Sequence, residues 1–264
     1  MKKFRLVVPI LTPFSRHEIN EDIFRKLLRH IFLYLERKDA VFISGFTGEF
    51  SKLSIENKKR LIEIAINENP DCRIILGVTN DYESFDDIDA FVALPINYNN
   101  NEELLEYYEN IISHGPTILY NNPNINKNNI PIRIIEELKN EIIGVKDSSG
   151  DLNYLKSLIK ICNVYQGDES KIYDALKLGA IGAVPGISNI FPNLPIELIE
   201  NYKKDLFVAM DMQKKINYIR SFYIMDPING IKASLELFDI KIENNFSGNK
   251  EKLLNALRKI NEEK

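Results

Sequence analysis

The sequence is poor in the residues that build metal and redox sites. Its only cysteines, Cys72 and Cys162, stand far apart and form no Cys-x-x-Cys pair, and its three histidines, His17, His30 and His114, have no second metal-ligating residue beside them. This pattern argues against a disulfide framework, a zinc site and metal-dependent catalysis. We therefore expect two buried thiols in a reducing compartment, no metal and no other cofactor.

Long apolar runs and nucleotide motifs are also missing. The apolar segments are far shorter than the roughly 20 residues of a membrane span, and neither a Walker motif nor GxGxxG occurs. The 34 basic and 38 acidic residues are interspersed and give a formal charge of −4, which favours neither nucleic acid nor an anionic membrane as a partner. The first residues lead directly into a strand-like segment without a cleavable apolar helix, so we expect a cytoplasmic protein.

Short Val- and Ile-rich runs alternate with longer amphipathic segments, which is typical of strand-helix units around a parallel sheet. Eight strands are expected at residues 5–12, 40–45, 73–79, 89–95, 117–121, 142–146, 163–167 and 180–184. Helices are expected between and after them at residues 21–37, 55–67, 101–113, 132–138, 152–161, 172–178 and 195–202, with only a short one at 82–87. The pattern predicts a (β/α)8 TIM barrel.

After the eighth unit the pattern becomes purely helical, with segments at residues 206–225, 228–238 and 249–261. We therefore expect a barrel at residues 1–203 and a C-terminal helical extension of the same domain at 204–264. Two Asn-dense stretches, 97–101 and 121–129, are interpreted as loops.

Barrel enzymes carry their sites at the C-terminal ends of the strands. Lys146 closes the apolar sixth strand and, by period-two alternation, shares a face with Ile142, Gly144 and Ser148. If that face is the lumen, burial favours the neutral amine, which attacks a ketone to form an iminium that acts as an electron sink. The more common situation for a lysine at a strand end is exposure to solvent or pairing with a neighbour such as Asp147.

Tyr120 ends the neighbouring fifth strand, where its hydroxyl can move protons for this chemistry, although an ordinary rim tyrosine is the simpler interpretation. Asn122 shares its face. The turn Gly45-Phe46-Thr47-Gly48 offers backbone N–H groups that could hold a carboxylate.

These motifs together resemble the dihydrodipicolinate synthase / N-acetylneuraminate lyase family of pyruvate-dependent aldolases. The resemblance rests on PILTPF at 9–14, GFTGE at 45–49, LP at 94–95, YNNP at 120–123, GVKDSSG at 144–150, GDE at 167–169 and IKA at 231–233. It implies that Lys146 is the Schiff-base lysine and Tyr120 the catalytic tyrosine. It further implies that Thr47 and the backbone of Phe46 and Thr47 bind the pyruvate carboxylate near the Val184 carbonyl, and that the enzyme is a homotetramer.

Departures from the family pattern bear on the substrate. Synthases that use aspartate semialdehyde usually carry an arginine shortly after YNxP, whereas Asn124, Ile125 and Asn126 follow here. Phe46 also replaces the first hydroxyl of the usual pair, so the proton relay of some relatives is not carried over. The neutral strand ends resemble those of a 2-keto-3-deoxygluconate aldolase, which releases pyruvate and glyceraldehyde.

Candidate ligands for sugar hydroxyls are Asn122, Ser148, Asp168 and Glu169, and Arg220 is a possible phosphate partner. The alternatives are a sialic-acid-type lyase, a dihydrodipicolinate synthase and, in another functional class, a non-catalytic barrel that senses a keto acid. Retention of both Lys146 and Tyr120 argues against the sensor, because binding alone needs neither residue.

Overall fold

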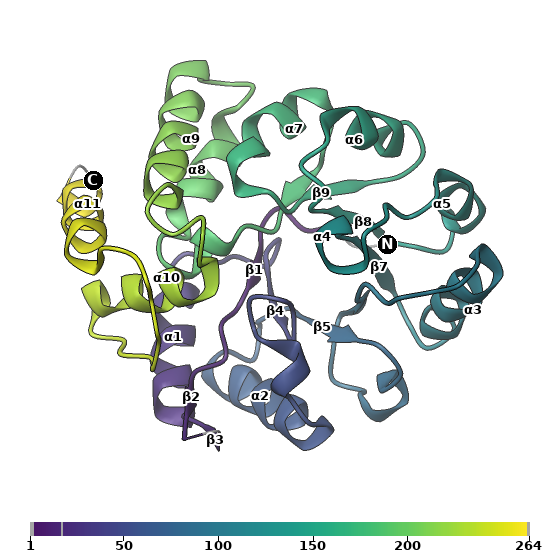
Figure 1. Cartoon of the computed structure of the whole chain (residues 1–264), viewed down its shortest axis with the longest axis horizontal. Helices are drawn as coiled ribbons and strands as arrows, with labels where there is room; N and C mark the ends of the chain where they lie inside the picture. Colours follow the sequence, from purple (N-terminus) through teal and green to yellow (C-terminus); the bar gives the residue numbers. More distant parts are fainter. Residues whose placement is uncertain (1–2, 17, 263–264) are drawn as a thin grey trace.

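The structure is a computed structural model that describes residues 3–16 and 18–262. Eight parallel strands follow one another around the sheet in chain order. A parallel bridge between Leu6 and Ala183 joins the first strand to the last, so the sheet closes into a barrel (Figure 1). The strands are β1 (Val7–Pro9), β4 (Ala40–Ile43), β5 (Ile74–Val78), β6 (Ala90–Ala93), β7 (Thr117–Asn121), β8 (Gly144–Asp147), β9 (Val164–Gln166) and β10 (Gly182–Ala183). The predicted (β/α)8 barrel is confirmed.

Alternation along each strand divides the core into two apolar layers. In β4, for example, Ala40 and Phe42 belong to a cluster inside the barrel, whereas Val41 and Ile43 belong to the layer between strands and helices. Tyr120 and Tyr165 are also members of the inner cluster. The residues that alternate with the outer layer therefore point into the lumen.

Helices surround the barrel on its outside (Figure 1). They are α1 (Glu21–Phe32), α2 (Ile55–Glu68), α3 (Asn101–Ile112), α5 (Ile132–Leu138), α6 (Leu152–Ile159), α7 (Ile172–Leu178) and α8 (Asn193–Asn201). Several begin where a side chain accepts an otherwise unbonded amide, as Ser54 does from the Asn57 N–H at 3.2 Å. Asp151 does the same for α6.

The third strand-helix unit lacks a full helix. Only the 3₁₀ turn η2 (Tyr82–Ser84) lies between β5 and β6, where a short helix at 82–87 was predicted. The buried Lys58 of α2 stabilises this connection, because its ammonium donates to Asp81 at 2.6 Å and to the Gly77 carbonyl at 3.2 Å. Other 3₁₀ turns are η1 (Phe50–Lys52), η3 (Glu169–Lys171), η4 (Gly186–Asn189) and η5 (Leu235–Phe238).

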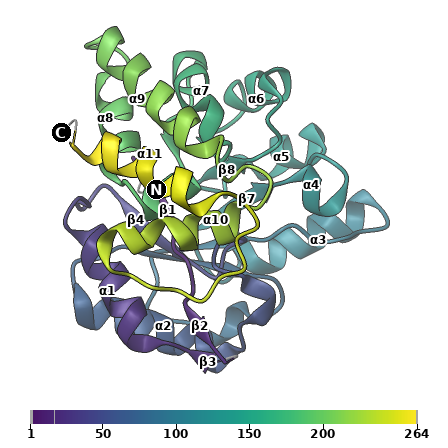
Figure 2. The same ribbon diagram turned by 60° about the vertical axis from the view of Figure 1, so that its left-hand side comes forward.

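Three further helices form the C-terminal appendage: α9 (Leu206–Arg220), α10 (Pro227–Ser234) and α11 (Lys250–Glu262). α9 packs against α8, and α11 packs against α9 and α10 (Figure 2). This confirms the predicted helical appendage. None of the described helices combines the length and apolarity needed to cross a bilayer.

Three features differ from the sequence expectation. A short hairpin, β2 (Phe14–Ser15) with β3 (Glu18–Ile19), follows β1. A one-turn helix, α4 (Pro123–Asn126), occupies part of the predicted loop at 121–129. Cys72 and Cys162 are only partly buried, although burial still raises the pKa of these thiols to about 12 and about 11. Both thiols are therefore largely protonated and unreactive near neutral pH.

Candidate active site

Lys146 and Tyr120 lie side by side inside the barrel. They are direct partners in the parallel pairing of β7 with β8, and they are 5% and 4% exposed. The Lys146 Nζ lies 3.7 Å from the centroid of the Tyr120 ring and 5.2 Å from that of Phe42. Within the described residues no carboxylate forms an ion pair with this amine. The amine is thus surrounded by aromatic rings rather than by counter-charge.

Asp147 points away from Lys146, as the alternation of β8 requires. Its carboxylate accepts hydrogen bonds from the Asn121 amide at 2.8 Å and from the Ser149 N–H at 3.0 Å. Burial raises the pKa of Asp147, although the hydrogen bonds from Asn121 and Ser149 act in the opposite direction. The side chain of Asp147 therefore orders the neighbouring loops and does not pair with the lysine.

The Tyr120 hydroxyl lies among polar side chains. Asn122 Nδ2 donates a hydrogen bond to it at 3.0 Å. Burial alone would raise the pKa of Tyr120, but the charge of Lys146 and the polar groups of Ser148 and Asn122 outweigh burial and lower the pKa below the ordinary value. The hydroxyl therefore gives up its proton more readily than an ordinary tyrosine, as a proton-transfer group requires.

Gly167, at the end of β9, leaves room for this arrangement. A Cβ at this position would lie 2.1 Å from the Ser148 Oγ and 3.2 Å from the Lys146 Cε. The sequence identifies Gly167 only as part of GDE, because the need for a missing side chain becomes visible only when β8 and β9 are placed together.

The loop at residues 45–49 lies next to the lysine. A Cβ on Gly45 would lie 2.7 Å from the ring of Phe42, the same ring that faces the Lys146 amine. In the described part of the chain, the N–H groups of Phe46, Thr47 and Gly48 donate to no acceptor. Such a run of unbonded amides is suited to binding an anion. The Phe46 side chain itself is 44% exposed.

Asp168 and Glu169 follow β9 at the rim but differ in their surroundings. Glu169 is buried, and its two oxygens accept from the Tyr223 hydroxyl and the Ile187 N–H, both at 2.7 Å. Burial raises the pKa of Glu169, against the hydrogen bonds from Tyr223 and Ile187. Both oxygens are thus engaged inside the protein, whereas the side chain of Asp168 is 18% exposed and borders the mouth.

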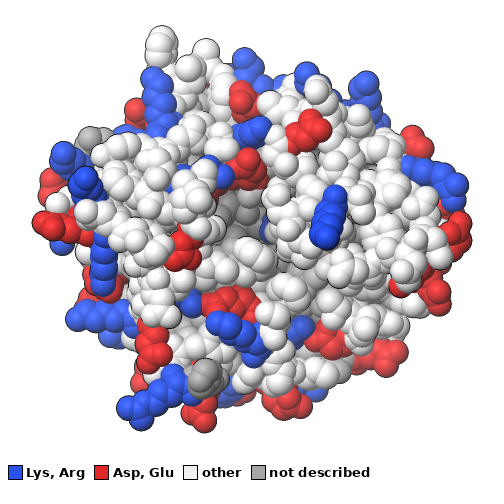
Figure 3. Space-filling view, viewed as in Figure 1, with Lys and Arg blue, Asp and Glu red and all other residues white. Residues whose placement is uncertain are grey.

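Arg220 of α9 links these two carboxylates. Its guanidinium lies 3.6 Å from Asp168 and 3.8 Å from Glu169. The face of the molecule seen in Figure 3 is hollowed near its centre, and charged side chains of both signs border the hollow.

Comparison with known proteins gives one consistent result. The model of the dihydrodipicolinate synthetase family matches residues 2–80 and 87–249. A 4-hydroxy-tetrahydrodipicolinate synthase of Thermodesulfovibrio yellowstonii is 30% identical, over 96% of both chains. The chain belongs to the dihydrodipicolinate synthetase family.

Solved structures agree on the fold. A dihydrodipicolinate synthase from Bacillus anthracis superposes with a TM-score of 0.85 at 22% identity, covering 98% of both chains. A prophage protein of the family from E. coli K12, solved in complex with pyruvate, superposes with a TM-score of 0.86 at 21% identity and the same coverage.

Members of the dihydrodipicolinate synthetase family are pyruvate-dependent carbon–carbon lyases and synthases, so the chain is an enzyme of this class. The resemblance inferred from the motifs is therefore confirmed. The family match is interrupted at residues 81–86, the connection between β5 and β6 that lacks a full helix.

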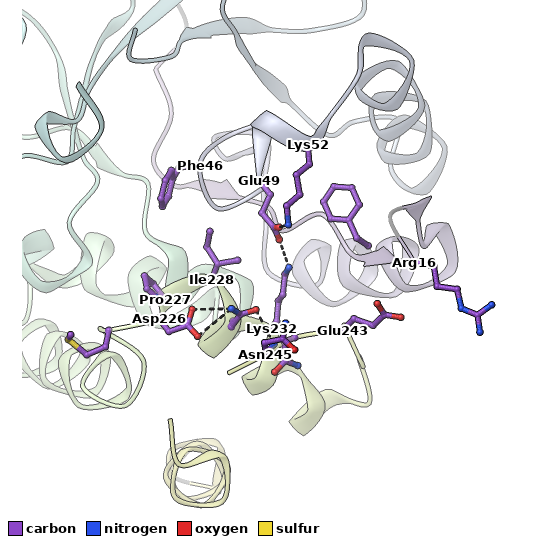
Figure 4. A pocket seen from close by; sticks show the side chains of 14 residues that line it. Arg16, Phe46, Glu49, Lys52, Asp226, Pro227, Ile228, Lys232, Glu243 and Asn245 are labelled. Atoms are coloured by element: carbon purple, nitrogen blue, oxygen red, sulfur yellow. Dashed lines mark hydrogen bonds and ion pairs between the residues drawn. The ribbon is translucent and has the colours of Figure 1, made fainter. Parts of the chain in front are cut away.

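A cavity of about 990 Å³ is lined by residues of the 45–49 loop and of α10. At its base the nearly buried Glu49 accepts from Lys52 and Lys232 (Figure 4). Burial would raise the pKa of Glu49, but the hydrogen bonds from Lys232 and Lys52 hold it below its usual value. Neither Lys146 nor Tyr120 lines this cavity.

The Glu49–Lys232 pair connects the 45–49 loop to the C-terminal appendage. The sequence placed both residues in motifs but assigned neither a role, because their contact joins positions 183 residues apart. The sequence offered one hint of this contact: Glu49 and Lys232 are charged residues within two of the motifs that carry the family resemblance.

The described residues contain no group of three or more His, Cys, Asp or Glu side chains placed to hold a metal ion. His30 contacts the Ile190 carbonyl at 2.9 Å, and His114 contacts the Asn110 carbonyl at 2.8 Å. His17 lies outside the described residues. Val184 is buried in the inner cluster.

Proposed function

We propose that this enzyme is a class I aldolase that reversibly cleaves 2-keto-3-deoxygluconate-type sugar acids to pyruvate and glyceraldehyde. The observation that carries the proposal is the buried amine of Lys146, free of carboxylates in the described chain and 3.7 Å from the ring of Tyr120. Attack of this amine on a ketone would form a Schiff base, which supplies the electron sink for carbon–carbon cleavage without a separate cofactor.

In the proposed reaction the Lys146 Nζ adds to C2 of the keto acid. The carbonyl oxygen takes one proton from the attacking amine and one from Tyr120, and it leaves as water. The resulting iminium withdraws electrons as the C3–C4 bond breaks, and the C4 hydroxyl proton passes to the Tyr120 phenolate. Protonation of the enamine at C3 and hydrolysis then release pyruvate. The lowered pKa of Tyr120 supports both directions of proton transfer.

Three backbone N–H groups support binding of the substrate carboxylate. Phe46, Thr47 and Gly48 present amides without acceptors in the described chain, on a loop seated against the ring of Phe42. A carboxylate held there would place the adjacent C2 carbonyl toward Lys146.

The charges at the mouth favour an uncharged aldehyde. Arg220 already pairs with the carboxylates of Asp168, at 3.6 Å, and Glu169, at 3.8 Å. Asn122, Ser148 and Asp168 remain as our candidates for the hydroxyl groups. Glu169 is no longer proposed as a direct ligand, because both of its oxygens are occupied within the protein.

A second candidate is the condensation of pyruvate with aspartate semialdehyde, favoured by the relatives known as 4-hydroxy-tetrahydrodipicolinate synthases at 27% and 30% identity. It would require a cation for the second carboxylate, and Asn124 to Asn126 offer none after the 120–123 motif. Sialic-acid-type cleavage is a third variant of the same chemistry.

The test combines trapping with a substrate panel. Borohydride reduction in the presence of pyruvate should leave an adduct on Lys146 by peptide mass mapping, absent in Lys146→Ala. Cleavage of 2-keto-3-deoxygluconate, its 6-phosphate and N-acetylneuraminate, and condensation with aspartate semialdehyde, should then be compared by kcat/KM. Absence of the adduct would refute the Schiff-base proposal, and a higher kcat/KM for aspartate semialdehyde would refute the sugar-acid assignment.

We further propose a cytoplasmic homotetramer in which residues 204–264 extend the barrel domain. Exposed apolar side chains on α9, including Phe207 at 88% and Leu206 at 49%, support subunit contacts. The Glu49–Lys232 pair supports a single folding unit. Light scattering would measure the assembly, and a chain truncated after residue 203 should fail to fold cooperatively.

A further inference from the structure

The motif at residues 9–14 follows β1 at the mouth of the barrel but has no part in the proposed reaction. Its Thr12 is 1% exposed, and the Thr12 hydroxyl donates to the Gly48 carbonyl at 2.8 Å. This hydrogen bond joins the end of β1 to the 45–49 loop that follows β4. The motif therefore contacts the loop to which we assign the substrate carboxylate.

Residues 46–49 of that loop form a turn in which the Gly48 carbonyl has a central place. The Glu49 N–H donates to the Phe46 carbonyl at 3.0 Å, so Thr47 and Gly48 are the two central residues of the turn. Their N–H groups are two of the three amides without acceptors in the described chain. The Gly48 carbonyl and the Glu49 N–H belong to one planar peptide group. The hydrogen bond from Thr12 therefore fixes the plane of the peptide that closes the turn.

The segment that carries Thr12 is itself held in place. The Leu11 N–H donates to the side-chain oxygen of Asn189 at 3.0 Å, and Asn189 is fully buried. The turn lies directly on this segment, because a Cβ on Gly48 would lie 2.9 Å from the Ile10 carbonyl oxygen. The Thr12 hydroxyl thus donates to the turn from a fixed position.

The Glu49–Lys232 pair anchors the same loop but does not replace this contact. Lys232 binds the side chain of Glu49, at the last position of the turn, and leaves the peptide groups of the turn unconstrained. No other side chain of the described residues hydrogen-bonds to the backbone of residues 46–49. The orientation of these peptide groups therefore depends on Thr12.

We propose that Thr12 is a positioning residue for substrate binding, which orients the turn at 46–49 so that its N–H groups hold the carboxylate of the keto acid. Without the Thr12 hydroxyl, the Gly48 peptide group can rotate and turn its carbonyl oxygen toward the anion. Thr12 acts through the turn and not on the ketone. It should therefore change how tightly the keto acid binds and not how fast the bound keto acid reacts. This inference rests on the proposed binding of the carboxylate to this turn.

The experiment measures borohydride trapping on Lys146 over a range of pyruvate concentrations in the wild type and in Thr12→Val. Valine has a similar size but no donor. We expect the half-saturating pyruvate concentration to rise about 3- to 10-fold, as for one lost hydrogen bond, while the maximal trapping rate stays within about twofold. Thr12→Ser keeps the hydroxyl and should bring the half-saturating concentration to within about twofold of the wild-type value.

Thr117→Val is the matched control. Thr117 is also buried, and its hydroxyl donates to the Gly115 carbonyl at 2.9 Å. It begins β7, so the same atom is removed from the same kind of hydrogen bond at the opposite end of the barrel. Because distant sites act independently, this variant should reach half-saturation within about twofold of the wild type. Thermal unfolding checks that both variants are folded.

Methyl pyruvate distinguishes positioning of the carboxylate from a general weakening of the site. It presents a ketone without the charged carboxylate, so its trapping on Lys146, located by peptide mapping, should be equal in Thr12→Val and the wild type. If Thr12→Val does not fold, Thr12→Cys, which carries a weaker donor of similar size, is measured by the same criteria.

Two results would overturn the inference. One is an unchanged half-saturating pyruvate concentration in the folded variant. The other is an equal loss of trapping with pyruvate and with methyl pyruvate, because the effect would then not depend on the carboxylate. A wild type that forms no adduct with pyruvate would instead overturn the proposed function.

Discussion

Removal of a single oxygen from Tyr120 should separate catalysis from folding. Tyr120→Phe leaves the ring and its contact with Lys146, but it deprives Asn122 Nδ2, which belongs to a buried side chain, of its acceptor at 3.0 Å. An unsatisfied buried donor costs about 1–3 kcal/mol. Against a typical unfolding free energy of about 5–15 kcal/mol, the variant stays folded.

The effect on the reaction should be much larger. Loss of a positioned acid–base group lowers a rate by about 10²–10⁴-fold, equivalent to about 2.7–5.5 kcal/mol of transition-state stabilisation. Single-turnover borohydride trapping with pyruvate measures the rate of Schiff-base formation, and urea unfolding measures stability. We expect the trapping rate to fall by at least 100-fold, while the free energy of unfolding falls by only about 1–3 kcal/mol.

Tyr154→Phe provides the control, because it removes the same atom from a tyrosine whose hydroxyl donates to the Ile130 carbonyl at 2.7 Å. It should lose similar stability and retain full activity. If Tyr120→Phe formed the Schiff base at the wild-type rate, the assignment of Tyr120 as the proton-transfer group would be wrong.

Three further outcomes are expected. Glu49→Gln should lower the free energy of unfolding by about 1–3 kcal/mol at pH 7. Because the folded state holds the pKa of Glu49 below its usual 4.5, the stabilisation from Lys232 is present above this pH and is lost as the pH falls through the lower folded value. The free energies of unfolding of the two proteins, measured with urea, should therefore converge as the pH is lowered below 4.5. Glu169→Gln should change kcat by less than about threefold in a steady-state assay, since direct transition-state contacts are worth far more. Gly167→Ala should reduce turnover at least tenfold at near-normal far-UV circular dichroism, because its Cβ would displace the Ser148 hydroxyl.

The order and type of the elements could be predicted from the sequence because burial repeats with the period of each element. The exact residues at which strands and helices begin and end could not be predicted. The first strand was predicted at 5–12 but is Val7–Pro9, although Ile10 and Leu11 are as buried as the strand itself and the Ile10 N–H still donates to the Phe42 carbonyl of β4 at 3.1 Å. The first helix was predicted to end at residue 37 but ends at Phe32, and the following Leu33 is 79% exposed.

The sequence contained a helix-capping signal at one helix that was not predicted. Helix α4 lies in the Asn-dense segment interpreted as a loop, yet Asn122 accepts from the Asn124 N–H and Pro123 occupies the first helical turn. An Asn cap followed by Pro is a recognised start signal. The β2–β3 hairpin offered no such signal, because two-residue strands are too short to show alternation.

The residues of the candidate site differ in the same way: some could be predicted from the sequence and others could not. Lys146 and Tyr120 were identifiable because each ends a strand, and parallel pairing of neighbouring strands brings their ends together without any knowledge of loops. Gly167 and the Glu49–Lys232 pair could not be identified in this way, because their roles depend on how close two backbones approach and on how the C-terminal helices fold back.

This division also explains why the reaction class is better defined than the substrate. The strand register fixes the amine, the phenol and the ring of Phe42, and these suffice for Schiff-base chemistry. The second substrate would instead meet side chains from loops and appended helices, such as Asp168 and its partner Arg220. Changing these residues alters the charge at the mouth without moving any strand, so one barrel can serve several aldehydes. Relatives at about 30% identity can therefore share the chemistry and differ in the aldehyde, which makes the charge at the rim a better guide to the substrate than overall similarity.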